Sequence, residues 1–280
     1  MYNLRYHIAS LVAVFLSLSI GLLLGTIVVE RGVLDRQKET IVQSLQQEFQ
    51  SLASENNELS AALASREDLV DTLLDAAVDG TLEGRTVLVL ASTGRADGLA
   101  SVNDTIEDAG GTAVTILLSQ PSLGLEDPEV SAVTTEVVGP VEPDALLEQT
   151  AATLAAEWAT PGAGRPLTEA LTSAGVMRVD GDPGPGVAID GVVVLAYFDD
   201  TADDGALAVA TALADAGYPG CGAEAQSVET GVAPAALEAG LSAVDHMGTP
   251  EGAYSLTWIL TARASGYYGL REGARAPWPE

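Results

Sequence analysis

Residues 86–118 read TVLVLASTGRADGLASVNDTIEDAGGTAVTILL, and this stretch decides the fold. Its first six residues, 86–91, are rich in β-branched and aliphatic side chains, and residues 112–118 form a second run of the same kind. Between them, residues 97–109 show a helical pattern that closes at a Gly-Gly pair. Two strand-like runs joined by a helix indicate a β-α-β unit, in which both strands lie parallel in one sheet.

The same alternation returns further along the chain. Residues 192–197 read VVVLAY and lead into a helical segment over residues 203–216, which Gly217 closes. Strands that alternate with helices of this length predict an α/β fold with a mostly parallel, doubly wound sheet covered by helices on both faces. We expect this acidic α/β domain to span residues 85–270, followed by a C-terminal tail of residues 271–280.

The stretch between these two units contains Pro/Gly-rich loops and two helical patterns, over residues 144–157 and 167–174. We interpret residues 119–186 as insertions in the α/β domain and not as a separate domain. A last helix is expected over residues 251–265, where apolar residues favour packing on the sheet.

Residues 35–79 carry a 3.5-residue repeat ahead of the α/β domain. Position a of this repeat holds Val42, Phe49, Asn56, Leu63, Val70 and Ala77. Position d holds Leu45, Leu52, Leu59 and Leu73, with Arg66 as the polar exception. A single Asn at position a is typical of a parallel two-stranded coiled coil, since paired Asn side chains fix its register. We therefore predict a dimeric stalk; the alternative is one amphipathic helix lying on the globular domain.

Residues 8–29 read IASLVAVFLSLSIGLLLGTIVV and contain no charge. About 20 such residues in a helix cross a hydrocarbon layer of about 30 Å. The apolar run passes directly into Glu30 and Arg31 without a small-residue cleavage site, which favours an uncleaved signal anchor. Positive charges flank both ends of this run and do not decide its orientation. The large, lysine-poor domain that follows favours a cytoplasmic N-terminus. We therefore expect a single-pass membrane protein in which residues 1–7 form a cytoplasmic stub and the α/β domain is extracytoplasmic.

Small residues recur every four positions within this span. They are Ala13, Ser17, Gly21 and Gly25. This spacing places them on one helical face, where a second helix can approach closely, and Gly21 and Gly25 form a G-x-x-x-G pair. Together with Asn56 in the stalk, they predict dimerisation through both segments.

Charge and cysteine content exclude several functions. The 280-residue chain has 12 basic and 40 acidic residues and a net charge of −28, a field that repels phosphate backbones. We therefore expect no nucleic-acid partner. Cys221 is the only cysteine, so an intrachain disulfide and a four-cysteine zinc site are impossible.

A doubly wound sheet binds its ligands at the carboxyl ends of its strands. Ser92, Thr93 and Gly94 follow the first strand, but the chain has neither G-x-G-x-x-G after that strand nor a P-loop, so a nucleotide site is not supported. The later strand is followed by four acidic residues, Asp199, Asp200, Asp203 and Asp204. Carboxylates suit Mg²⁺ or Ca²⁺, yet we favour the alternative that they cap the start of the next helix.

Catalytic and metal-binding residues are scarce. Nucleophilic catalysis requires a base, and the chain offers His7, at the membrane edge, and His246, without a G-x-S-x-G motif. We expect no enzyme. Soft metal ions prefer Cys, His and Met ligands, which makes Cys221, His246 and Met247 weak metal candidates. The residues firmly imply no cofactor.

Both ends of the chain carry a pattern seen in a known family. Residues 5–25 follow R-x-H-x-x-S-L-x-A-V-F-L-x-L-x-x-G-x-x-x-G. Near the other end come Ser242-Ala243-Val244-Asp245, a turn with Gly252, an apolar helix and Gly266-Tyr267-Tyr268-Gly269. With the coiled coil between them, these motifs resemble the actinobacterial copper transporter family typified by the mycobacterial copper transport protein.

The resemblance implies a role in copper homeostasis, in which a membrane-bound oligomer moves copper out of the cell or across the envelope and copper is the transported or bound ion. A lone span without ionisable residues cannot conduct an ion, so a pathway would require an oligomer or another protein. Two other hypotheses stay open. One is a dimeric envelope scaffold that docks a partner, and the other is a small-molecule sensor or enzyme using the strand ends near Thr93 and Asp199.

Overall fold

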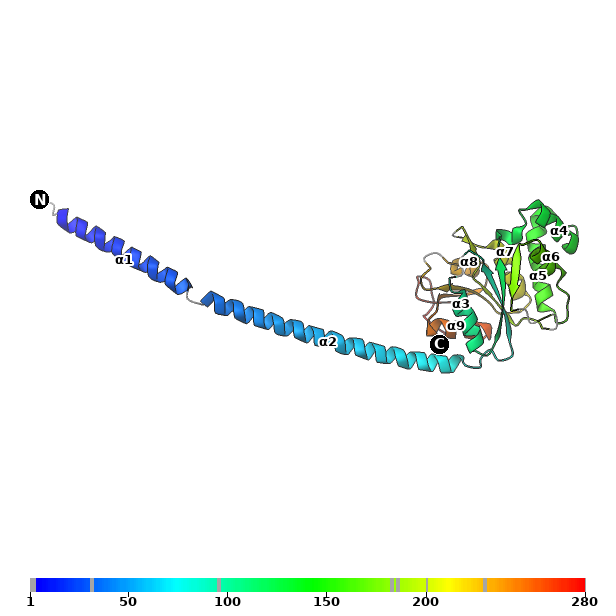
Figure 1. The fold of residues 1–280 in the computed structure, drawn as a ribbon, viewed down its shortest axis with the longest axis horizontal. Helices are drawn as coiled ribbons and strands as arrows, with labels where there is room; N and C mark the ends of the chain where they lie inside the picture. The colour runs from blue at the N-terminus through cyan, green and yellow to red at the C-terminus, as the bar shows by residue number, and fades with distance from the viewer. Residues whose placement is uncertain are drawn as a thin grey trace. The chain divides into compact units, whose positions relative to one another are not determined.

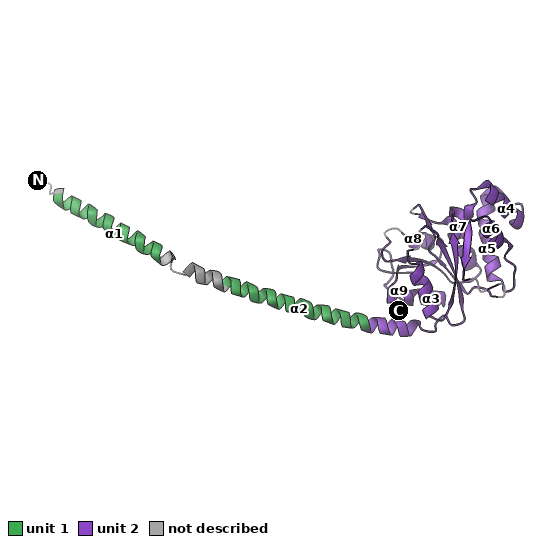
Figure 2. Ribbon diagram, in the orientation of Figure 1, with its two compact units in different colours: residues 1–68 green, residues 69–280 purple. Residues whose placement is uncertain are grey.

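The computed structural model describes residues 4–30, 33–94, 97–181, 184, 187–199, 201–228 and 231–279. Figure 1 shows the order of the elements along the chain, and Figure 2 shows the two compact units into which they divide, residues 1–68 and residues 69–280.

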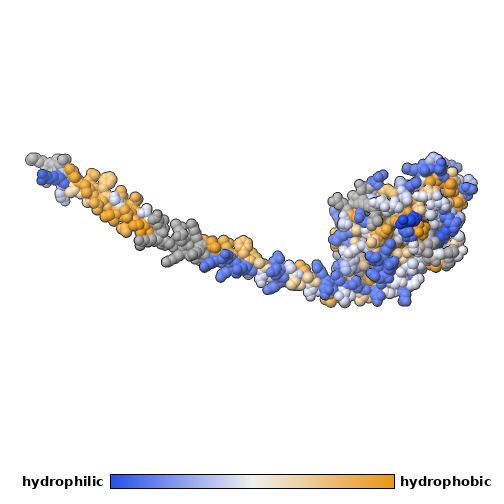
Figure 3. Space-filling view, in the orientation of Figure 1, coloured by the Kyte–Doolittle hydropathy of each residue, from blue (hydrophilic) through white to orange (hydrophobic). Residues whose placement is uncertain are grey.

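Two long helices dominate the first unit. Helix α1 spans Leu4–Glu30, and its stretch Arg5–Ile27, with a mean hydropathy of 2.4, is long and apolar enough to cross a membrane. Figure 3 shows hydrophobic residues along most of this helix. Helix α2 spans Val33–Val78 and ends in the second unit. Its position a and d side chains are exposed, among them Phe49 at 70% and Leu59 at 59%. Pairing of two stalks stays a prediction.

The second unit is built on a seven-stranded sheet with the order β3-β2-β1-β4-β7-β8-β9. The strands are β1 Thr86–Ser92, β2 Thr112–Leu118, β3 Met177–Asp180, β4 Gly191–Val194, β7 Gly220–Ala225, β8 Ser242–Met247 and β9 Tyr267–Tyr268. All pairings are parallel except that of β2 with β3. The chain moves outward from β1, returns to β4 beside it, and moves outward again. The predicted mostly parallel, doubly wound fold is confirmed.

Helices cover both faces of this sheet (Figure 1). The alternation of β1 sorts its side chains: Val87 and Val89 join the cluster with α3 (Leu99–Asp108) and α9 (Pro250–Leu260), whereas Leu88 and Leu90 face the other cluster. The second face is covered by α5 (Leu146–Ala159), α7 (Asp204–Asp215) and α8 (Ala233–Glu238), with α4 (Pro128–Val138) and α6 (Pro166–Ser173) packed beside α5. The two faces together give the domain its core.

The sheet corrects the interpretation of residues 119–186 as insertions only. This stretch contains β3, which adds an antiparallel edge strand, and a helix, α4, that the sequence patterns did not predict. It also contains the short 3-10 helices η1 (Pro121–Gly124) and η2 (Pro143–Ala145).

Two predicted elements are shorter in the structure. The run predicted over residues 192–197 divides, since β4 ends at Val194 and Tyr197 belongs to β5 (Tyr197–Phe198), which pairs antiparallel with β6 (Thr201–Ala202). The last helix ends at Leu260 and not at residue 265. Ala262 adopts φ 57°, and the N–H groups of Arg263 and Ala264 both donate to the carbonyl of Trp258, which closes the helix.

Candidate functional site

The three metal candidates lie on neighbouring strands without converging. Cys221 on β7 pairs in register with Ser242, the first residue of β8. His246 and Met247 lie four and five residues further along β8, a separation of about 13 Å or more at the rise of a β-strand. Among the residues that the structure describes, no group of three or more His, Cys, Asp or Glu side chains is placed to hold a metal ion. A metal ion bound by any one candidate stays a prediction.

Cys221 and Met247 belong to the apolar cluster on the α3/α9 face. Burial raises the pKa of the Cys221 thiol, which keeps it protonated and weak as a metal ligand. Met247 reaches this cluster because the register of β8 shifts: Ala223 pairs with Val244, but Ala225 pairs with Met247. The extra residue of this β-bulge puts Val244 and Met247 on the same face although they are three positions apart.

Among the described residues, the strand ends near the β1–β4 switch point form hydrogen bonds with one another and enclose only a small cavity. The Ser92 hydroxyl accepts a hydrogen bond from the Tyr197 N–H at 3.1 Å, and the Thr93 N–H donates to the carbonyl of Leu118 at 2.8 Å. The cavity between the ends of β4 and β7 has a volume of about 20 Å³. Pockets for organic ligands are typically about 300–1,000 Å³. A nucleotide does not fit in this cavity.

Asp203 caps a helix, as its sequence position predicted. Its carboxylate accepts from the N–H of Ala206 at 2.8 Å in the first turn of α7 and from the N–H of Ser122 at 2.7 Å. Burial raises its pKa, and these backbone donors lower it. The carboxylate thus fixes η1 against α7. Asp200, which was considered with it both as a capping residue and as a cation ligand, lies outside the described residues.

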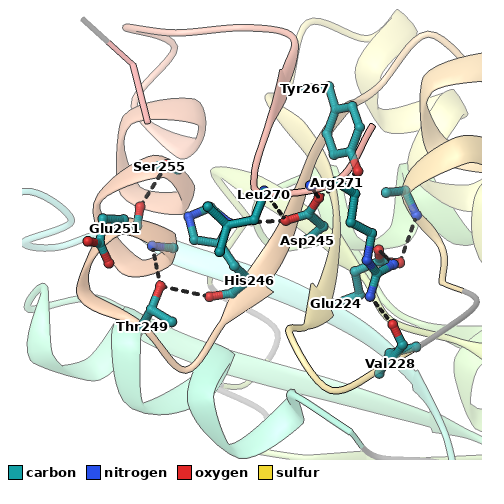
Figure 4. Close-up of polar contacts among 12 residues, drawn as sticks. Glu224, Val228, Asp245, His246, Thr249, Glu251, Ser255, Tyr267, Leu270 and Arg271 are labelled. Atoms are coloured by element: carbon teal, nitrogen blue, oxygen red, sulfur yellow. Dashed lines mark hydrogen bonds and ion pairs between the residues drawn. The ribbon is translucent and has the colours of Figure 1, made fainter. Parts of the chain in front are cut away.

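A polar cluster with three buried and two half-buried side chains occupies the carboxyl ends of β7 and β8 (Figure 4). We call it the C-terminal network, and it consists of Glu224, Asp245, His246, Tyr267 and Arg271. The Asp245 carboxylate is its centre: it accepts from the Tyr267 hydroxyl at 2.6 Å and from the N–H groups of Leu270 and Arg271 at 2.9 and 3.1 Å. With Asp245 only 1% exposed, these donors replace the water that it loses on folding.

Glycine is required where the chain passes Asp245. A Cβ on Gly269 would lie 2.0 Å from Asp245 Oδ1, far inside van der Waals contact. The absence of a side chain there lets residues 269–271 wrap closely around the carboxylate.

Glu224 and Arg271 form the second part of the network. Glu224 is 3% exposed, pairs with the Arg271 guanidinium and also accepts from the Ala233 N–H at 3.2 Å. The same guanidinium donates to the carbonyl of Val228. Burial raises the pKa of Glu224, while the Ala233 N–H and the Arg271 charge lower it. The Arg271 cation therefore favours the ionised form of the buried Glu224 carboxylate.

His246 is 1% exposed, and its imidazole lies between Glu251 and Asp245 (Figure 4). Nδ1 is 3.4 Å from Asp245 Oδ1, and within the described chain neither ring nitrogen has a partner with hydrogen-bond geometry. Burial lowers the pKa of this histidine, and the carboxylates of Asp245 and Glu251 oppose that effect. We expect the ring to be neutral in the folded protein.

The network joins a late part of the chain to the sheet. Residues 266–279, which we call the C-terminal segment, contain β9 and contribute Tyr267 and Arg271 to the network. Its attachment continues at Gly266, whose N–H donates to the Ser242 hydroxyl at 3.1 Å. The network thus holds the C-terminal segment over the edge of the sheet where related folds bind ligands. The carboxylates of Asp245 and Glu224 already accept hydrogen bonds from the chain itself.

The C-terminal sequence pattern corresponds to this network. Asp245 and Tyr267 belong to it, and Gly269 lets the chain pass close to Asp245. Ser242 holds the start of the C-terminal segment through the Gly266 N–H, and a Cβ on Gly252 would be 2.4 Å from the carbonyl oxygen of His246. Sequence reasoning missed Glu224 and Arg271. They are 47 positions apart, and no local spacing links them before the fold is known.

These features define a class of protein: an α/β domain behind a long helix and a helix of membrane length, with its own C-terminal segment over the ligand edge of the sheet. Comparison with protein families is more specific. The family described as "Copper transport outer membrane protein, MctB" matches residues 1–279, and the chain belongs to this family. The curated proteins include no match to the chain.

Proposed function

We propose that this chain takes part in copper homeostasis at the cell envelope, in the transport or efflux of copper, as a membrane-anchored and non-catalytic protein. The family match over residues 1–279 carries this proposal. In it, α1 is an uncleaved single-pass anchor with a cytoplasmic N-terminus, and the α/β domain lies outside the cytoplasm. The length and hydropathy of Arg5–Ile27 support the anchor.

The proposal assigns copper movement to an assembly and not to one chain. Residues 8–29 contain no ionisable side chain, so a single span offers no ligand or charge to an ion inside the bilayer. Cys221 and Met247 are buried in an apolar cluster, and His246 is enclosed by the C-terminal network. An oligomer of this chain, or a second envelope protein, has to supply the pathway.

Dimerisation through α1 and α2 is part of this proposal. On α1, Ser17, Gly21 and Gly25 line one groove, and a Cβ on either glycine would meet no atom within 4 Å. On α2, Leu45 and Leu52 at position d are exposed at 47% and 56%. A second copy would bury both surfaces, and Asn56 would set the register.

The proposal is tested in cells that lack the chain. We expect them to accumulate copper and to become sensitive to it, and the intact chain to restore both properties. A variant with Gly21→Leu and Gly25→Leu should restore less, while Ser19→Leu with Leu23→Ala serves as the control, because both positions lie outside the groove on another face of the helix. Unchanged copper content and growth in the deletion strain would contradict a role in copper homeostasis.

A second candidate is an envelope scaffold whose stalk presents the α/β domain to a partner. Two observations favour it: the a and d side chains of α2 are exposed, and the described cavity at the strand ends is only about 20 Å³. A scaffold explains both features without a metal ion. Crosslinking in intact cells should then capture another envelope protein in addition to the homodimer. If the homodimer alone is captured, the scaffold hypothesis loses its basis.

A further inference from the structure

An open hollow lies beside the C-terminal segment, away from the network just described. Its volume is about 530 Å³, and we call it the arginine hollow after Arg263 and Arg275 in its wall; Ser265, Tyr268 and Trp278 also line it. A neighbouring hollow of about 280 Å³ shares Arg263 and Ser265 and reaches Gly220 and Ser242. Since these begin β7 and β8, the site lies toward the amino ends of the strands.

The charge of this hollow is opposite to that of the chain. The chain has 40 acidic and 12 basic residues, yet among the described residues no Asp or Glu lines either hollow. Arg263 and Arg275 are exposed, and no described carboxylate forms an ion pair with them. Two exposed guanidinium groups without a described carboxylate partner at one hollow favour an anion, most strongly a carboxylate or phosphate that accepts two parallel hydrogen bonds.

The backbone of both arginines is held by hydrogen bonds. The Arg263 N–H donates to the carbonyl of Trp258 at 2.9 Å, and its guanidinium lies 5.8 Å from the centre of the Trp258 ring. The Arg275 N–H donates to the carbonyl of Tyr267 at 2.9 Å, next to the bridge between Tyr268 and Ala276. Fixed backbones reduce the entropy that is lost when the guanidinium groups bind a ligand.

Aromatic rings form the other wall. Trp278 is 43% exposed, and Tyr268 is 5% exposed with its hydroxyl donating to the Ser265 carbonyl at 3.2 Å. The tyrosine therefore offers its ring and not its hydroxyl. An apolar or ring-shaped part of a ligand fits beside these side chains, and the volume is within the range of small-molecule sites.

We propose that the arginine hollow binds a small organic anion, with its phosphate or carboxylate between Arg263 and Arg275 and its apolar part against Trp278. This site is independent of the proposed role in copper homeostasis.

The test uses the full chain in uncharged detergent, with phenyl phosphate and benzoate as probes. Calorimetry measures binding, and fluorescence reports on Trp278, with Trp278→Phe to identify its signal. We expect Arg263→Gln and Arg275→Gln each to weaken phenyl phosphate binding about tenfold, the loss of one charge-assisted contact. Arg178→Gln is the matched control, because it removes the same charge at an exposed pair on β3. Absence of binding at millimolar probe, or equal losses in all three variants, would overturn the proposal.

Additional probes test whether the aromatic rings contribute to binding and whether the anion belongs to a soluble molecule or to a lipid headgroup. Inorganic phosphate should bind more weakly than phenyl phosphate if the rings contribute, and equal affinity would remove the aromatic part of the proposal. Vesicles of phosphatidylglycerol and of phosphatidylcholine test a lipid headgroup. Arg263-dependent binding to the anionic vesicles without binding of phenyl phosphate would overturn the assignment to a small soluble anion. Unchanged melting temperatures of the variants would show that the fold is retained.

Discussion

The two ends of the β-sheet in the α/β domain contain charged groups in opposite states. At the carboxyl ends of β7 and β8, the Arg271 guanidinium pairs with Glu224, and Asp245 accepts hydrogen bonds from backbone N–H groups of the C-terminal segment (Figure 4). Toward the amino ends, Arg263 and Arg275 are exposed and have no described ionic partner. Enclosed charges that already have partners are not accessible to a ligand, whereas exposed charges without a described partner are.

The comparison qualifies a general rule for this fold. Open α/β sheets bind ligands beyond the carboxyl ends of their strands, where a crevice forms at the switch point. In this chain the cavity there is about 20 Å³, and the C-terminal segment occupies the neighbouring edge. A fold therefore indicates where a crevice can form, and the packing of later residues decides whether it stays open.

Removal of the Asp245 carboxylate should produce the largest loss of stability at the paired end of the sheet. Asp245→Ala would leave the Tyr267 hydroxyl and two backbone N–H groups without their acceptor, at a cost of about 3–5 kcal/mol in the free energy of unfolding. Denaturant unfolding of the full chain in detergent measures this loss. Asp204→Ala, at an exposed position in α7, is the control, and a similar small effect of both changes would contradict a central role of Asp245.

Removal of Arg271 should produce the next largest effect. Arg271→Ala leaves Glu224 buried without its cation, and we expect a loss of about 2 kcal/mol at neutral pH. Burial already raises the pKa of Glu224, and a raised folded-state pKa gives stability below the unfolded value that is lost as the pH rises. The loss should therefore be larger at pH 8 than at about pH 4.5, as unfolding at both pH values will show. A loss independent of pH would separate Arg271 from Glu224.

His246 should give the network a smaller, graded pH dependence. Its folded-state pKa is lowered chiefly by burial, so the unfolded chain takes up the proton first as the pH falls below 6.5. Stability is thus present above that value and is lost as the pH falls through the folded-state pKa, by at most about 1.4 kcal/mol per pH unit. Unfolding between about pH 5 and 8 should be steeper in the wild-type chain than in His246→Gln. Parallel curves of stability against pH for the two chains would show that a group other than His246 causes the pH dependence.

Changes at the open end should affect stability least. Arg263→Gln and Arg275→Gln remove exposed guanidinium groups that form no described ion pair, so we expect each to change the free energy of unfolding by no more than about 0.5 kcal/mol. Thermal unfolding of the full chain provides the measurement. A loss comparable with that of Asp245→Ala would mean that both ends of the sheet serve the fold.

Local patterns in the sequence predicted the elements with strong periodicity. The apolar run of residues 8–29 lies within α1, and the heptad positions of residues 42–77 lie within α2. The runs of residues 86–91 and 112–118 became β1 and β2 with nearly the expected bounds. Each of these has a composition that matches its period, so neighbouring residues alone determine it.

Strands β7 and β8 lack such a signal. Strand β7 reads GCGAEA, whose Gly, Ala and Glu residues have low β propensity, and β8 places Asp245 and His246 in a buried strand. They form strands because the sheet pairs and covers them, which is a tertiary effect. Glu224 and Arg271 were missed for the same reason: only the fold brings residues 47 positions apart into contact.

The short edges of the sheet have a consequence for crowded membranes. At one edge β9 has two residues, and at the other β3 has four, including the exposed ion pair of Arg178 and Asp180. Short and charged edge strands are poor templates for adding a strand from another molecule. If anchors concentrate many copies in one plane, these edges limit sheet-to-sheet aggregation, so the protein can be present at high surface density and stay dispersed.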